Sequence, residues 1–119
     1  MKIFILTIII ALSVSAYASD YKKRNGVLSL TPEGGYARFN INASYGATSG
    51  ICELDGKAMP SVTQQGQRNR WVYNDQSSMC VAVISELRSG AMQIITKDCD
   101  SYCGVSAIGA MDGKYNKIK

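Results

Sequence analysis

The segment from Tyr36 to Tyr45 alternates apolar and polar side chains almost one for one. Successive side chains of a β-strand point to opposite faces, so this pattern predicts a strand with one buried and one wet face. The apolar positions are Ala37, Phe39, Ile41, Ala43 and Tyr45, and the polar positions are Arg38, Asn40, Asn42 and Ser44. A chain containing such a strand has to build a sheet that covers a core with one face.

Other short apolar segments recur at a spacing of roughly ten residues, which is typical of all-β sandwiches and barrels. Glycine-containing turns separate them, and we expect hairpin turns at Asp55-Gly56 and Asp112-Gly113, with a last hairpin formed by residues 105–111 and 114–118. Helix is expected only near residues 98–102. The sequence therefore predicts an all-β fold, a small antiparallel β-barrel or sandwich of roughly seven to eight strands.

The first residues, Met1 to Ala18, are typical of a secretory signal peptide. Lys2 is followed by an uncharged, mostly apolar run over residues 3–14 and by the cleavage pattern Ala16-Tyr17-Ala18. The run is shorter than the roughly 20 residues needed to cross a bilayer, so no stable membrane anchor is expected after cleavage. We expect cleavage after Ala18, a single domain over residues 19–119, and a periplasmic or secreted protein.

Four cysteines in a small exported domain favour two disulfides, and three pairings are then possible. Zinc is the competing interpretation, but the chain has no histidine and the cysteine spacing does not match a zinc motif. We expect Cys99 to pair with Cys103 across a local corner, and Cys52 to pair with Cys80 between two strands. The other pairings remain open, because sequence alone does not determine connectivity.

Little in the chain points to catalysis. Without histidine, a triad of the Ser-His-Asp or Cys-His kind cannot be built. The glycines lack the strand-to-helix context of a phosphate-binding loop, so we expect no enzyme activity, no cofactor and no metal. Aromatic side chains could instead line a ligand cavity, although core packing is their commoner use. They are Tyr36, Phe39, Tyr45, Trp71 and Tyr73.

Thirteen lysines and arginines, one of them in the predicted signal peptide, face nine acidic residues. So mild an excess argues against a nucleic-acid partner for an exported chain. Basic runs such as residues 22–24 are usually solvated ends, and a basic face for an acidic partner is the alternative. Arg68, Arg70 and Trp71 lie beside a polar segment predicted to be a mobile loop, residues 63–69, and Tyr102 lies at the cysteine corner. Arginine, tryptophan and tyrosine are often dominant at interfaces, so these four residues are the candidate partner-binding residues.

The C-terminal part carries a resemblance to a known group of proteins. Tyr102-Cys103-Gly104 followed by Asp112-Gly113-x-Tyr115, together with a cysteine ahead of Asp55-Gly56 and a central Cys80 strand, resembles small bacterial periplasmic β-barrel proteins of the lysozyme-inhibitor type. Those inhibitors place a Ser-Gly-x-x-Tyr loop in the lysozyme cleft. The nearest strings here begin at Ser49 and Ser89, and neither has the tyrosine.

The resemblance implies a periplasmic protein that binds and inhibits a peptidoglycan hydrolase. Because the inhibitory loop is absent, the target is either lysozyme or a rival's secreted cell-wall-degrading toxin, in which case the protein is an immunity protein. The alternatives are a small-ligand carrier and a structural or stress-related envelope protein without catalytic activity.

Overall fold

A computed structural model describes residues 18–118, and the predicted signal peptide, Met1–Ala18, lies outside them apart from its last residue. The described chain forms eight strands and two 3-10 helices. Neither helix in this part of the chain is long and apolar enough to cross a membrane. The strands are β1 (Ser19–Lys23), β2 (Gly26–Glu33), β3 (Tyr36–Ser44), β4 (Ile51–Pro60), β5 (Gln67–Asn74), β6 (Val81–Leu87), β7 (Met92–Lys97) and β8 (Gly113–Lys117). The helices are η1 (Asp100–Tyr102) and η2 (Val105–Ala107).

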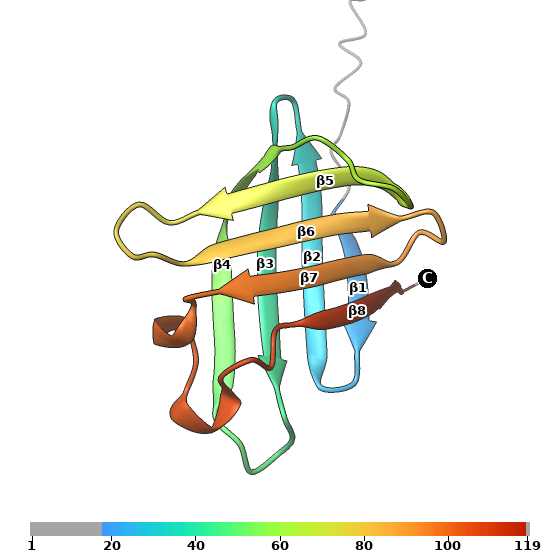
Figure 1. Cartoon of the computed structure of the whole chain (residues 1–119). Coiled ribbons are helices and arrows are strands. Elements are labelled where there is room, and N and C mark those ends of the chain that lie inside the picture. Colours follow the sequence, from blue (N-terminus) through green and yellow to red (C-terminus); the bar gives the residue numbers. More distant parts are fainter. Residues whose placement is uncertain (1–17, 119) are drawn as a thin grey trace, which may run out of the picture.

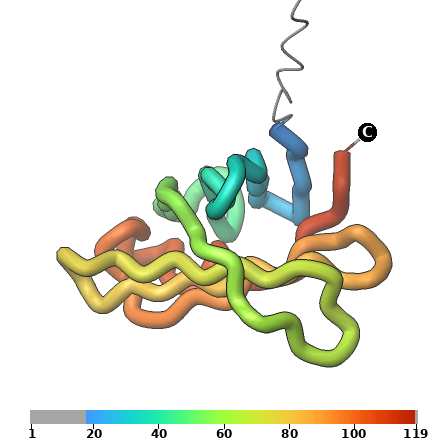
Figure 2. The backbone as a smooth tube through the Cα atoms, turned by 90° about the horizontal axis from the view of Figure 1, so that it is seen from above, coloured from blue at the N-terminus to red at the C-terminus, as the bar shows by residue number. Residues whose placement is uncertain are grey.

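The strands form a closed antiparallel barrel in sequence order, and β8 pairs with β1 to close it. This confirms the predicted all-β fold and selects the barrel over the sandwich. Strands β1 to β4 run steeply across the direction of β5 to β8, so the barrel consists of two sheets packed nearly at right angles (Figure 1). Figure 2 shows the two sheets as layers, with β5 to β7 of the second sheet below β2 to β4 of the first sheet on the page.

The two sheets are joined along two short seams. Strand β4 pairs with β3 over eight residue positions but with β5 only through Met59–Val72 and Pro60–Trp71. Strand β8 pairs with β1 only at Lys117–Tyr21 and Asn116–Lys22. Most of the ladder hydrogen bonding therefore lies within each sheet.

Strand β3 follows the predicted alternation, with every second side chain from Ala37 to Ala43 buried. The barrel interior is filled by side chains from both sheets. The largest fully buried ones include Phe39, Leu28, Leu30, Ile41, Leu54, Ile84, Met92, Ile94, Met111 and Tyr115. Phe39 is a core residue, and the partly buried ring of Tyr73 packs against it edge to face, with the two ring centres 5.2 Å apart.

The predicted hairpin turn at Asp55-Gly56 is wrong, because β4 continues straight through it and residues 57–60 belong to the same strand. Gly56 lies opposite Phe39 in the register with β3. A Cβ at this glycine would lie 2.5 Å from the Tyr73 ring, so the glycine leaves the space that the ring occupies. Asp55-Gly56 therefore lies inside a long strand, where the glycine makes room for a neighbouring ring.

A prediction for the C-terminal part is also wrong. At the start of the described chain, β1 turns the side chain of Tyr21 into the core. The expected strand at residues 105–111 is η2 followed by a turn, so β8 pairs with β7 and β1 and forms no hairpin of its own. The predicted helical turn near residues 98–102 is confirmed as η1.

The two predicted disulfides are confirmed in number but the pairing is wrong. Cys52 is bonded to Cys103, and Cys80 is bonded to Cys99. Cys80 and Cys99 lie just beyond the paired ends of β6 and β7, where Val81 faces Lys97. The helical turn η1 then carries the chain to β4, where Cys103 forms an antiparallel bridge with Cys52.

Candidate functional site

Three of the four predicted partner-binding residues lie on β5, where a bulge leaves Arg68 unpaired and exposed. Trp71 packs partly against the core, and by strand alternation Arg70 points to the outer face. Tyr102 lies in η1, beyond the opposite end of the β5–β7 sheet. The structure therefore brings Arg68 and Trp71 to one end of the barrel and places Tyr102 at the other.

Tyr102 holds the corner at its end of the barrel. Its hydroxyl donates a hydrogen bond to Oδ2 of Asp75. Oδ1 of the same carboxylate accepts bonds from the Ser77 amide, at 3.0 Å, and from the Ser77 hydroxyl, and Oδ2 also accepts a bond from the Ser78 hydroxyl. These donors hold the pKa of the Asp75 carboxyl well below its usual range, with the Tyr102 hydroxyl the largest contribution. The same bond raises the pKa of Tyr102 to about 12. The tyrosine thereby ties η1 to the β5–β6 turn.

We expect Tyr102→Phe to be less stable than the wild type at neutral pH, with a difference that shrinks in acid. The lowered pKa of Asp75 stabilises the folded state fully above the carboxyl's unfolded value of about 3.9, and this contribution is lost progressively as the pH falls from that value through the lower pKa of the folded state. Urea unfolding at pH 7 and pH 2 measures the effect. Tyr45→Phe is the matched control, since that hydroxyl bonds a backbone carbonyl, Ile108 O, at 3.0 Å. A difference that persists unchanged at pH 2 would contradict the role of the Asp75 charge.

The two sheets differ in charge. Strands β1 to β4 carry four acidic and four basic residues, whereas β5 to β8 carry five basic residues and one acidic residue, Glu86. The basic residues of the second sheet are Arg68, Arg70, Lys97, Lys114 and Lys117. The positive charge of the barrel strands is thus concentrated on one sheet.

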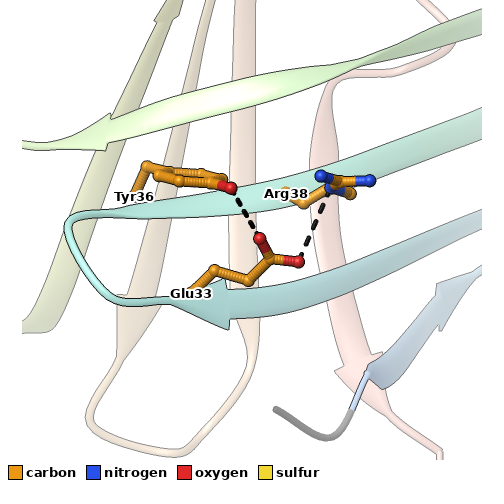
Figure 3. A network of polar contacts seen from close by, with 3 residues as sticks. All are labelled: Glu33, Tyr36 and Arg38. Atoms are coloured by element: carbon orange, nitrogen blue, oxygen red, sulfur yellow. Dashed lines mark hydrogen bonds and ion pairs between the residues drawn. The ribbon is translucent and has the colours of Figure 1, made fainter.

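On the first sheet the long charged side chains neutralise one another. Tyr36 donates a hydrogen bond of 2.6 Å to Glu33, and Arg38 Nε lies 3.6 Å from the same carboxylate (Figure 3). Lys57 Nζ lies 5.0 Å from the centre of the Tyr36 ring. A shallow hollow of about 480 Å³ lies over this part of β2 to β4, lined by acidic, basic and uncharged polar groups. Such a mixed surface has no single charge preference.

The outer face of the second sheet has a different character. Met59, Val72, Val83 and Ile95 are aligned in register across β4 to β7 and form an apolar row. Met59 is 56% exposed and Ile95 is 55% exposed. A neighbouring row runs through Arg70, Ser85, Gln93 and Lys114. We call the apolar row, with Arg70, Lys114 and Lys97, the basic face.

Among the described residues, no carboxylate lies within 4 Å of the charged nitrogens of Arg70, Lys97 or Lys114, although Asp98 follows Lys97 directly in the chain. Glu86, the single acidic residue of β5 to β8, lines the barrel end, and the ion pair found within residues 18–118 is Glu33–Arg38 on the other sheet. Arg70 packs its Nε against the sheet without a hydrogen-bond acceptor. The face therefore offers an exposed apolar row and unpaired positive charge to a partner.

Sequence reasoning found Arg70 but missed the apolar row and Lys97. The row depends on which residues stand opposite one another in four strands, and no local pattern reports that register. The exposed apolar residues within otherwise alternating strands, Met59 and Ile95, were the available signal.

Within residues 18–118 no three His, Cys, Asp or Glu side chains are grouped to hold a metal ion. All four cysteines are in disulfides, so none is a free thiol. No family model matches the chain, and neither a curated protein nor a solved structure matches it.

Proposed function

We propose that this is an exported protein that binds a peptidoglycan hydrolase through the basic face and inhibits it by covering the active-site cleft. The observation that carries the proposal is a partly exposed apolar row beside cations that form no ion pair, on the outer face of one sheet. The target is a lysozyme or a secreted cell-wall-degrading toxin, and in the second case the protein is an immunity protein.

The chemistry of glycoside hydrolysis explains the choice of partner. Glycosidases use a pair of carboxyl groups flanking the scissile bond, so the cleft is acidic where substrate binds. A surface with Arg70, Lys97 and Lys114 attracts such a cleft and speeds association. The apolar row between these cations supplies the buried centre that a stable interface needs.

The rigidity of the face favours tight binding. Its strands are held in a closed barrel, and the Cys80–Cys99 disulfide clamps the ends of β6 and β7. A sheet that is already ordered loses little conformational freedom on binding, so less of the contact energy is spent on ordering it. This mode uses a sheet face, and it does not need the Ser-Gly-x-x-Tyr loop.

We expect Ile95→Asp and Lys97→Glu each to weaken inhibition by about tenfold or more, because interface centres and complementary charges dominate such contacts. Ile95 is 55% exposed, so its replacement leaves the core intact. Residual activity of a panel of lysozymes and peptidoglycan hydrolases, together with binding rates at low and high salt, measures the effect. Lys97→Glu should act chiefly on the association rate.

Lys22→Glu is the matched control, because it makes the same charge change on an exposed residue of β1 on the other sheet. It should leave inhibition nearly unchanged. Equal losses for Lys22→Glu and Lys97→Glu would mean that net charge, and not the basic face, attracts the enzyme. Absence of binding to every hydrolase of the panel would overturn the proposed function.

A further inference from the structure

Basic residues from the two ends of the described chain meet at the seam that closes the barrel. Lys22 of β1 stands opposite Asn116 of β8 in the antiparallel register of these strands. A hollow of about 390 Å³ lies beside this pair, and it is lined by Lys22, Lys23, Arg24, Asn116 and Lys117. Four of its five lining residues are therefore cations, and the fifth carries an amide.

The basic run at residues 22–24 is built into the barrel wall. Lys22 and Lys23 pair with Val27 and Gly26 in the ladder between β1 and β2. The Nζ of Lys23 also donates a hydrogen bond of 2.8 Å to the backbone carbonyl of Asp112. A solvated chain end has no such contacts, so the positions of these cations are set by the fold.

The cations of this hollow lack counter-ions. Within the described part of the chain, no carboxylate lines the hollow or lies within 4.0 Å of its charged nitrogens. Burial lowers the pKa of Lys23, and the charge of Asp112 partly opposes this shift. Oδ1 of Asp112 is itself occupied by bonds from the amide and the hydroxyl of Thr96. The repulsion among the clustered cations is thus relieved when an anion enters the hollow.

We infer that this hollow is a binding site for a phosphate monoester. Such a group carries about two negative charges at neutral pH and has three acceptor oxygens, so one group contacts several cations at once. Arginine binds phosphate through two parallel N–H donors, and lysine binds it as a point charge. A carboxylate has a single charge and two oxygens, and it satisfies fewer of the donors. None of the lining residues belongs to the basic face, so the inference does not depend on the proposed inhibition.

The test titrates the oxidised chain without its predicted signal peptide, residues 19–119, with phenyl phosphate, phenyl sulfate and benzoate. The three probes share one ring and differ in the anionic group. Amide NMR spectra of isotope-labelled protein report where each probe binds and how tightly. We expect shifts centred on residues 22–24 and 116–117, and an affinity for phenyl phosphate about fivefold or more above that for phenyl sulfate, which has a similar shape and less charge. Added salt should weaken the binding, because the cations are near the surface.

Vesicles distinguish two sources of the phosphate group. Phosphatidate carries a phosphate monoester at a membrane surface, so the protein is sedimented with vesicles of phosphatidylcholine alone and with vesicles that also contain phosphatidate. Retention by the phosphatidate vesicles and release by phenyl phosphate would assign the site to a lipid head group. Binding of phenyl phosphate without retention by either kind of vesicle would assign it to a soluble phosphate ester.

Arg24→Glu reverses one charge at the hollow. We expect it to weaken binding of phenyl phosphate by about tenfold, because a donor is lost and a repelling carboxylate replaces it. Arg88→Glu is the matched control, since Arg88 is likewise an exposed arginine in a hairpin turn, between β6 and β7. It should bind like the wild type.

Four results would overturn the inference. They are the absence of saturable shifts with phenyl phosphate at low salt, equal affinities for the three probes, shifts centred on the basic face, and equal losses for Arg24→Glu and Arg88→Glu. The comparison of the three probes uses the wild-type protein, so a folding defect in a variant leaves that test intact.

Discussion

Replacing Cys52 and Cys103 together by alanine is expected to lower the free energy of unfolding by about 4 kcal/mol. The two residues are 51 apart in sequence, and in the chain-entropy model a longer closed loop removes more freedom from the unfolded chain. Replacing Cys80 and Cys99, which are 19 apart, should cost about 3 kcal/mol. Urea unfolding of the two double variants under oxidising conditions measures both values.

The same pair of variants tests the pairing. Each double variant keeps the other disulfide, so neither should contain a free thiol when titrated after unfolding. The double variant of Cys52 and Cys80 leaves two cysteines that are partners of the removed ones, and it should be less stable than either. Greater stability of that variant than of the other two would instead support the pairing of Cys52 with Cys80 and of Cys99 with Cys103.

Phe39→Ala is expected to cost about 3 to 5 kcal/mol of stability, the range for removing a large aromatic ring from a packed core. Phe39 is only 2% exposed, and its ring packs edge to face on Tyr73. Thermal and urea unfolding measure the loss.

Val62→Ala is the control for this substitution. Val62 is 85% exposed in the segment that follows β4, and its truncation should change stability by less than about 0.5 kcal/mol. If Phe39→Ala cost no more than Val62→Ala, the Phe39 ring would not be part of a close-packed core.

Features that depend on local pattern were predictable from the sequence. The alternation from Tyr36 onward predicted β3 to within one residue, and the turn composition of Ser89-Gly90 matches the turn between β6 and β7. That turn also predicts the Cys80–Cys99 disulfide, because a hairpin folded about it brings Cys80 close to Cys99. The shorter spacing from Cys99 to Cys103 favoured the wrong pairing.

Features that depend on contacts distant in sequence were not predictable. Asp55-Gly56 has the composition of a turn, yet pairing with β3 and the Tyr73 ring keep it in a strand. Of the four candidate partner residues, Tyr102 bonds Asp75 and Trp71 lines the barrel end, and neither role has a local signature. The basic face requires the register of four strands at once.

The short seams between the two sheets have a consequence for how the barrel fails. With two residue pairs at β4–β5 and two at β1–β8, a brief parting of the sheets breaks few hydrogen bonds. Such an opening bares the backbone edges of β4 and β5, which are then free to recruit strands from other molecules. The Cys52–Cys103 bridge ties the β7–β8 connection to β4 and limits how far the sheets separate. Reduced protein is therefore the form most prone to aggregate, even at temperatures where each sheet still holds its own ladder.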